Sequence, residues 1–256
     1  MQKEQPTMTK NYCVYHTLWS KRYYKMINFL FPRICSWCGS SGSYLCQICK
    51  KQLHPHPEIC PLTHRPSPWY AVRKDILTIP SPLDWCIVLF LFEPLIKKLI
   101  LWLKYYHRRD ISAFLGERLA LALQSHEYLS QSLILNSQFL ITYVPSHRIR
   151  KYITKWYNQS ELLAQQLCKA LWNQIPYKRI CKKTKNTHSQ VGMTKSERKN
   201  NLTNVFEMIE PITVWSIIII VDDVLTSGAT MIEMATTIKK SQPDCQVWGL
   251  CIARNG

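Results

Sequence analysis

The sequence predicts an α/β protein whose mainly parallel sheet follows a small cysteine-rich module near the N-terminus. From residue 83 onward, apolar runs of strand length alternate with stretches of helical periodicity, and strands separated by helices favour a parallel sheet covered on both faces. Before that region, four cysteines stand in two Cys-x2-Cys pairs between residues 35 and 49. Hydrophobic residues fill 46% of the 256 positions, which excludes a largely disordered chain.

Composition divides the chain into four regions. We expect a basic, aromatic N-terminal extension over residues 1–32, a zinc-binding module over 33–65, a proline-rich connector over 66–82 and the α/β domain over 83–256. Residues 12–31 could lie on an anionic membrane surface, although a loosely packed extension is the more common arrangement. No apolar run approaches the roughly 18 to 20 residues of a membrane span, and no secretory signal opens the chain, so we expect a cytoplasmic protein without a transmembrane segment.

The cysteine pairs have the spacing of metal ligands. Two pairs joined by a short loop can supply four thiolates to one tetrahedral ion, and Zn²⁺ is the usual occupant of such a structural site. The four candidate ligands are Cys35, Cys38, Cys46 and Cys49. Iron–sulfur or redox use is the alternative, and Cys60 with His64 could hold a second metal. Seven further cysteines are scattered and are expected to be buried thiols in a reducing compartment.

The remaining elements follow from proline content and periodicity. Proline fixes backbone angles and removes a hydrogen-bond donor, so the connector is expected to be an extended tether. Strands are expected over residues 85–92, 138–144, 217–221 and 246–252, and helices over 93–104, 111–123, 156–171 and 229–240. Residues 217–221 are all β-branched without polar alternation, which is typical of a central parallel strand buried on both faces.

The most informative stretch follows that strand. Asp222 and Asp223 come at its carboxyl end, and a short loop then carries Thr226, Ser227 and Gly228 at the start of a helix. Ligands of parallel sheets bind beyond such strand ends, and backbone N–H groups at a helix N-terminus bind anions. Carboxylates beside an anion need other partners, such as sugar hydroxyls or a divalent cation. A 5′-phosphorylated ribose with a metal-chelated diphosphate would satisfy every group, whereas the alternative is a simple helix cap with solvated acids.

This stretch resembles the phosphoribosyl pyrophosphate (PRPP) motif of type I phosphoribosyltransferases, and the wider chain resembles the ComF family, which includes the ComFC and GntX-like proteins. Four further segments carry the resemblance. They are the two cysteine pairs, residues 103–105 (LKY), residues 141–147 with 157–160, and a segment containing 187–190, 197–198, 201–202 and Phe206. Two departures are visible: residues 155–159 read Lys-Trp-Tyr-Asn-Gln where the family has Arg-Gly-Phe-Asn-Gln, and a second set of cysteine pairs is missing.

The resemblance implies a type I phosphoribosyltransferase-like domain over residues 83–256 that binds PRPP with Mg²⁺. The ribose hydroxyls and the 5′-phosphate would be held by Asp222, Asp223, Thr226, Ser227, Gly228, Ala229 and Thr230. The diphosphate would lie near Pro145, Ser146 and His147, with Lys182, Lys183 and Arg198 on a mobile loop that closes over it. An active protein would be a pentosyl transferase, for which the residues identify neither acceptor nor general base.

The charge balance indicates an anionic partner. The formal net charge is +17, and residues 146–199 hold 13 Lys and Arg against two Glu. Lys151, Lys155, Trp156 and Tyr157 combine cations with aromatic rings, as single-strand binders do, although the aromatic residues could equally belong to a helix core. The family resemblance implies a role in DNA uptake during natural transformation. A single-stranded nucleic-acid-binding protein without catalysis, or a PRPP-sensing regulator, is the alternative function.

Overall fold

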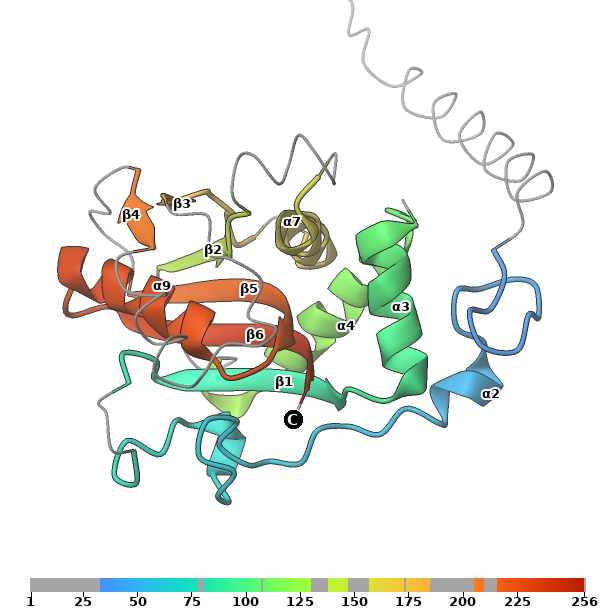
Figure 1. Cartoon of the computed structure of the whole chain (residues 1–256), viewed down its shortest axis with the longest axis horizontal. Coiled ribbons are helices and arrows are strands. Elements are labelled where there is room, and N and C mark those ends of the chain that lie inside the picture. The colour runs from blue at the N-terminus through green and yellow to red at the C-terminus, as the bar shows by residue number, and fades with distance from the viewer. Residues whose placement is uncertain are drawn as a thin grey trace, which may run out of the picture. The chain divides into compact units, whose positions relative to one another are not determined.

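The protein divides into two compact units, Met1–Gln52 and Leu53–Gly256. The computed structural model, shown in Figure 1, describes residues 33–77, 81–106, 108–129, 138–146, 157–172, 174–184, 205–209 and 216–255. Within the described part of the chain, no helix has both the length and the apolar character that crossing a membrane requires.

The described part of the first unit, residues 33–52, is built from tight turns and one short helix. The backbone N–H of Cys35 donates to Ser40 O at 2.7 Å, and the N–H of Gly39 donates back to Cys35 O at 3.1 Å. Helix α2 (Gln47–Lys50) follows, and Cys46 is its N-cap residue, with its sulfur accepting from the N–H of Cys49. Because both cysteine pairs lie at these turns, local backbone hydrogen bonds hold their sulfurs in place.

The second unit contains a four-stranded parallel sheet, as the sequence predicts. Its strands are β1 (Trp85–Leu91), β2 (Phe139–Tyr143), β5 (Ile217–Leu225) and β6 (Gln246–Arg254), in the order β1-β6-β5-β2. The apolar run of β5 is fully enclosed, since residues 217–221 are at most 3% exposed. This confirms the sequence-based expectation of a central strand covered on both faces. An additional antiparallel pair, β3 (Cys181–Lys183) with β4 (Phe206–Met208), was not predicted.

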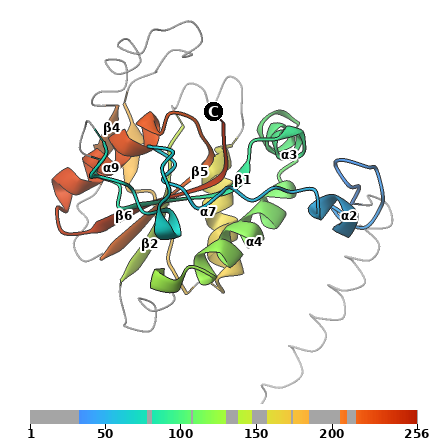
Figure 2. The same cartoon turned by 90° about the horizontal axis from the view of Figure 1, so that it is seen from below.

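Helices cover both faces of the sheet. Helix α9 (Ala229–Ser241) packs Met231, Met234 and Ile238 against one face, while α4 (Ile111–Gln124) and α7 (Gln159–Ala170) lie on the other, as the two views in Figures 1 and 2 show. Helix α3 (Pro94–Tyr105) follows β1. A Cβ at Gly116 of α4 would lie 2.5 Å from Gln166 Cβ, so only glycine allows α4 and α7 to approach this closely.

The helix predicted over residues 156–171 begins later than expected. Asn158 has an extended backbone (φ −97°, ψ 123°), and its side chain accepts a hydrogen bond from the N–H of Ser160. Asparagine side chains cap helices in this way, because they satisfy an N–H that has no partner within the helix. The helix therefore starts at Gln159, and Tyr157 lies outside it.

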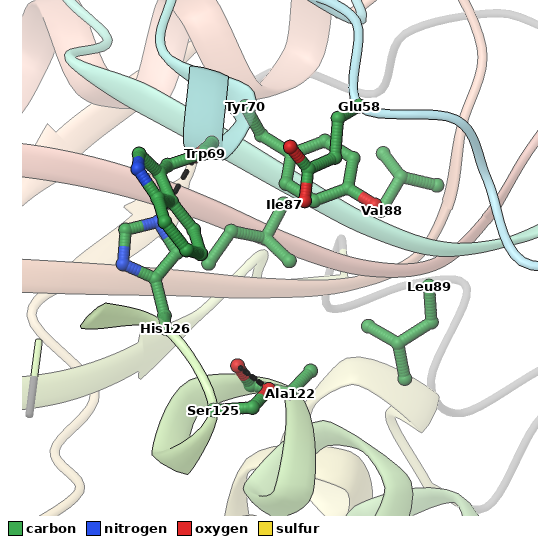
Figure 3. A pocket seen from close by; sticks show the side chains of 9 residues that line it. All are labelled: Glu58, Trp69, Tyr70, Ile87, Val88, Leu89, Ala122, Ser125 and His126. Atoms are coloured by element: carbon green, nitrogen blue, oxygen red, sulfur yellow. Dashed lines mark hydrogen bonds between the residues drawn. The ribbon is translucent and has the colours of Figure 1, made fainter. Parts of the chain in front are cut away.

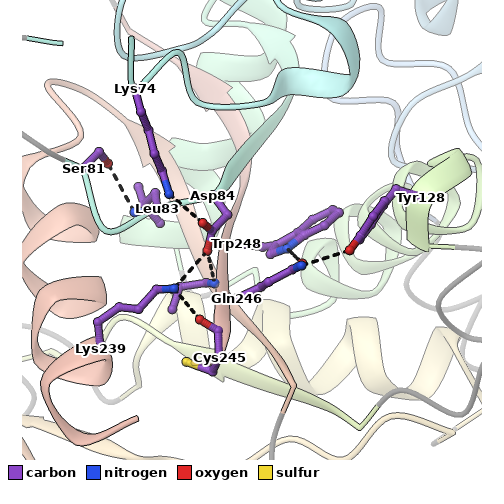
Figure 4. A network of polar contacts seen from close by, with 10 residues as sticks. Lys74, Ser81, Leu83, Asp84, Tyr128, Lys239, Cys245, Gln246 and Trp248 are labelled. Carbon is purple, nitrogen blue, oxygen red and sulfur yellow. Dashed lines mark hydrogen bonds and ion pairs between the residues drawn. The ribbon is translucent and has the colours of Figure 1, made fainter. Parts of the chain in front are cut away.

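The described part of the proline-rich segment packs against the sheet, and it is not the extended tether that proline content suggested. Figure 4 shows the main polar contact, centred on Asp84 just before β1. Its carboxylate pairs with Lys74 Nζ at 2.6 Å and Lys239 Nζ at 3.4 Å, and it accepts from the N–H of Val247 at 2.8 Å. One half-buried acid thus joins this segment to α9 and β6. The domain boundaries at residues 65 and 82 remain predictions.

Candidate functional site

The acid pair lies inside β5, not after it. The predicted end of this strand at Val221 is wrong, because β5 stays paired with β6 as far as Leu225 opposite Arg254. Asp222 and Asp223 are therefore held by regular sheet hydrogen bonding at the carboxyl end of a central strand. This is the edge at which open parallel sheets bind their ligands.

Lys104 of α3 neutralises the second acid. Its Nζ lies 2.8 Å from Asp223 Oδ2, and the two side chains are only 23% and 10% exposed. Burial alone would lower the pKa of the Lys104 ammonium, but the charge of Asp223 and the hydrogen bond to it raise that pKa above its ordinary value. From the sequence, Lys104 was noted only as part of residues 103–105, one of the segments that carry the family resemblance. Its position beside Leu103, at the edge of the apolar stripe of a helix, was a further signal that it points partly inward.

Asp222 is held by α7 and by its own neighbour. Its Oδ1 accepts from Ser160 Oγ at 2.8 Å and from the N–H of Asp223 at 2.9 Å. Burial and the charge of Asp223 together raise the pKa of Asp222 to about 6, although the Ser160 hydrogen bond and the charge of Lys104 act in the opposite direction. The two carboxylates thus share one ammonium, and Asp222 takes up a proton at mildly acidic pH. Ser160 was a second partner that sequence reasoning missed.

The loop after β5 opens directly onto α9. Thr226 and Ser227 are exposed, and Gly228 is the N-cap residue in a left-handed conformation with φ +75°. The positive φ of this position favours glycine, and a Cβ here would also displace the end of the Leu62 side chain, whose Cδ2 would lie 2.5 Å away. The first turn of this 13-residue helix, with Ala229 and Thr230, faces the loop. The predicted phosphate-binding residues are therefore contiguous with the acid pair.

Residues 144–146 come close to the same edge through α7. The Asn158 side-chain amide donates to Val144 O at 2.9 Å, and the N–H of Val144 donates to Val221 O at 3.1 Å. Pro145 is buried and Ser146 half-buried, so both of these diphosphate candidates are anchored next to β5. His147 lies outside the described residues.

The other candidates are dispersed. Lys182 and Lys183 lie on β3, where Lys182 Nζ pairs with Glu207 at 3.1 Å. Tyr157 is 7% exposed, its hydroxyl donates to Leu103 O, and Arg109 stacks 4.6 Å from its ring centroid, so this ring is not open to a nucleic-acid base. Three nucleic-acid candidates and one loop candidate lie outside the described residues: Lys151, Lys155, Trp156 and Arg198.

A separate pocket opens beside β1, and Figure 3 shows the side chains around it. Its volume is about 200 Å³, and it contains none of the residues that the sequence singled out. His126 is its buried ionisable group: burial lowers its pKa, and its Nε2 donates to Trp69 O at 2.9 Å. The lining residues are Glu58, Trp69, Tyr70, Ile87, Val88, Leu89, Ala122, Ser125 and His126. The pocket therefore lacks the paired acids and the helix N-terminus that define the site on β5.

The first unit contains a second candidate site, formed by four thiols. The sulfurs of Cys35, Cys38, Cys46 and Cys49 all lie within 4.8 Å of one another, and Cys38 Sγ is 3.6 Å from Cys46 Sγ. A zinc ion with four sulfurs at about 2.3 Å needs sulfur–sulfur separations of about 3.8 Å, so the cluster fits zinc. Burial acts to raise the pKa of Cys35, but hydrogen bonds from backbone N–H groups outweigh it and lower this pKa to about 6. For Cys49, burial and the neighbouring thiols both act in the same direction and raise the pKa to about 12.

We expect purified protein to contain about one zinc per chain, because four thiolates cannot share this space without a divalent cation. Replacing Cys38 and Cys46 with serine should remove most of the metal, as measured by mass spectrometry of the metal content. Cys168→Ala removes a thiol outside the cluster and should leave zinc unchanged. If the variant lacking Cys38 and Cys46 contained as much zinc as Cys168→Ala, the zinc would be bound outside the four-cysteine cluster.

The fold and the two candidate sites define an α/β protein with a parallel sheet, an acid pair at the carboxyl end of its central strand and a four-cysteine module near the N-terminus. The chain is 31% identical to Competence protein F of Haemophilus influenzae over 238 residues, which are 89% of this chain and all of that protein. It is 29% identical to DNA utilization protein YhgH of Escherichia coli over 228 residues, covering 86% and 97% of the two chains. No family model matches the chain. The chain belongs to the ComF family.

Proposed function

We propose that the carboxyl end of β5 binds phosphoribosyl pyrophosphate together with Mg²⁺. One observation carries the proposal: an acid pair on a central parallel strand, with Asp223 buried and Asp222 half-buried, leads without a break into a loop that ends at Gly228, the N-cap of a 13-residue helix. Acids suit sugar hydroxyls, and a helix N-terminus suits a phosphate. A phosphorylated sugar presents both kinds of group in one ligand.

Each part of the site has a role in that binding. Asp222 and Asp223 would accept hydrogen bonds from the ribose hydroxyls, while the N–H groups and hydroxyls of residues 226–230 would hold the 5′-phosphate. Lys104 keeps the acid pair ordered and reduces its negative charge, which favours neutral hydroxyls over a second anion.

The residues present fit Mg²⁺ as a partner of the ligand. Mg²⁺ prefers oxygen ligands and commonly binds through one or two carboxylates plus substrate phosphates. Asp222 and Asp223 would supply the protein oxygens, and the ion would neutralise the diphosphate. In a transferase, that diphosphate would leave the anomeric carbon. The role of this protein would be to hold the sugar in a fixed position while the diphosphate leaves.

We further propose that this binding serves the uptake or use of DNA. Two relatives of the chain, named as a competence protein and a DNA utilization protein, support this role. A net charge of +17 suits a protein that works beside a polyanion.

Isothermal titration with PRPP in the presence of Mg²⁺ tests the proposal. We expect one saturable site per chain, and we expect the joint substitution Asp222→Asn and Asp223→Asn to weaken binding at least about tenfold, because an amide can also donate and no longer matches the hydroxyls. Asp244→Asn removes an exposed acid and is the matched control. If the joint variant binds as tightly as the unchanged protein, the acid pair does not hold the ligand.

A further inference from the structure

The outward face of α3 combines cations with exposed aromatic rings. The buried side of this helix is formed by Leu95, Ile96, Leu99, Ile100 and Leu103, so the opposite side faces solvent. That side carries Lys97, Lys98, Leu101, Trp102 and Tyr105, and the turn after the helix adds Tyr106, Arg108 and Arg109. We call this set the α3 surface. It contains none of the nucleic-acid candidates that the sequence suggested.

Two of the cations lie over the indole ring of Trp102. Lys98 Nζ lies 5.5 Å from the Trp102 ring centroid, and the Arg108 guanidinium lies 5.3 Å from it. Each such contact contributes about 0.5 to 1 kcal/mol at an exposed position. Lys98 is one turn before Trp102, so the helix itself sets that contact. Two positive charges are thereby held at fixed places on the surface.

The two tyrosines beside these cations extend into water. Tyr105 is 60% exposed and Tyr106 is 67% exposed. They are the last residue and the C-cap residue of α3, and the N–H of Tyr106 donates to Trp102 O at 3.2 Å. Their backbone is therefore rigid, so little conformational entropy is lost when a flat group stacks on either ring. Exposed neighbouring rings on a rigid element are a common feature of binding surfaces.

The positive charge of the α3 surface favours an anionic partner. Lys97, Lys98, Arg108 and Arg109 supply four cations, and Asp110, which pairs with Arg108 at 3.0 Å, is the nearest acid along the chain. Cations beside stacking rings match a strand whose phosphates and bases are both accessible. In a duplex the bases stack on one another and hide their faces, so the rings would have nothing to bind.

We infer that the α3 surface binds single-stranded DNA through stacking on Tyr105 and Tyr106 and through phosphate contacts to Lys97, Lys98 and Arg109. This inference rests on the DNA role in the proposed function and is independent of PRPP binding. Lys104 lies on the same helix next to Tyr105, so the DNA surface and the acid pair are adjacent.

Fluorescence anisotropy with labelled oligo(dT) of about 16 nucleotides tests the inference. Joint replacement of Tyr105 and Tyr106 with alanine should weaken binding at least about tenfold, since stacking contributes about 1 to 3 kcal/mol per base. Lys97→Glu should also weaken binding and make it less dependent on salt, because fewer counterions are released. The matched controls are Trp172→Ala, which removes a ring that is 77% exposed, and Lys240→Glu, which makes the same change of charge on α9.

Three results would overturn the inference. The tyrosine variant could bind oligo(dT) as well as the unchanged protein does while keeping its melting temperature. The same variant could lose affinity for duplex DNA or oligo(U) but keep its affinity for oligo(dT), which would point to another nucleic acid. Alternatively, phosphatidylglycerol vesicles could bind through these residues while oligo(dT) does not, which would indicate a membrane surface. PRPP titration of the tyrosine variant should be normal, so failure of this inference is distinguishable from failure of the proposed function.

Discussion

Replacing Lys104 with methionine should lower the free energy of unfolding by about 3 kcal/mol at about pH 8, because it leaves the buried carboxylates of Asp222 and Asp223 without their cation. Methionine keeps most of the side-chain volume, so the loss reports charge and not packing. At about pH 5 the loss should be much smaller, since a proton can then replace the missing ammonium. Urea unfolding at both pH values measures the difference.

Two comparisons make this result specific. Lys240→Met removes an exposed lysine of α9 and should change the free energy of unfolding by no more than about 0.5 kcal/mol. Adding Asp223→Asn to Lys104→Met should recover much of the stability, because the carboxylate that pairs directly with Lys104 is then gone and only Asp222 still carries a charge. An equal loss at both pH values would mean that Lys104 acts through packing, and the electrostatic account of the site would be wrong.

Asp222→Asn should have the opposite effect and stabilise the protein by about 2 kcal/mol at about pH 8. Burial raises the pKa of Asp222 to about 6 from an ordinary value of 3.8, so the folded protein holds this proton more tightly than the unfolded chain does. Stability therefore falls as the pH rises between these two values, and above them the ionised carboxylate destabilises the fold by a constant amount. Asparagine carries no charge, and its oxygen can still accept from Ser160.

The pH profile of the melting temperature checks this expectation. The stabilisation by Asp222→Asn should be largest above about pH 6 and should vanish below about pH 3, where Asp222 is protonated in both states. Asp244→Asn, at an exposed acid, should leave the profile unchanged. A gain that does not change with pH, or a loss at about pH 8, would show that Asp222 is ionised in the folded protein without an energetic cost.

The strands and helices could be predicted because their signals are local. The β-branched run of β5 and the apolar spacing of α3, α4 and α9 depend only on residues close in sequence, and the expected elements agree with the structure to within a few residues. The start of α7 was missed because Asn158 competes with a helical continuation through its side chain, which periodicity does not register. Strands β3 and β4 are too short, at three residues each, to carry a periodic signal.

The acid pair could be predicted, but its partners could not. Asp222, Asp223 and the loop to Thr230 are contiguous, so their motif is visible in one stretch of sequence. Lys104 and Ser160 come from two other helices, and only the packing of α3 and α7 beside β5 brings them to the acids. The cysteine cluster was predictable for the same reason as the acid pair, since two short pairs and one turn suffice to define it.

The most direct test of the account is a crystal structure of the protein determined with PRPP and Mg²⁺. We expect the ribose hydroxyls within hydrogen-bond distance, about 2.7 Å, of the carboxylates of Asp222 and Asp223, and the 5′-phosphate against the backbone N–H groups of residues 226–230. Electron density for the ligand at any other place, with the end of β5 and its loop unchanged, would contradict the assignment of this site.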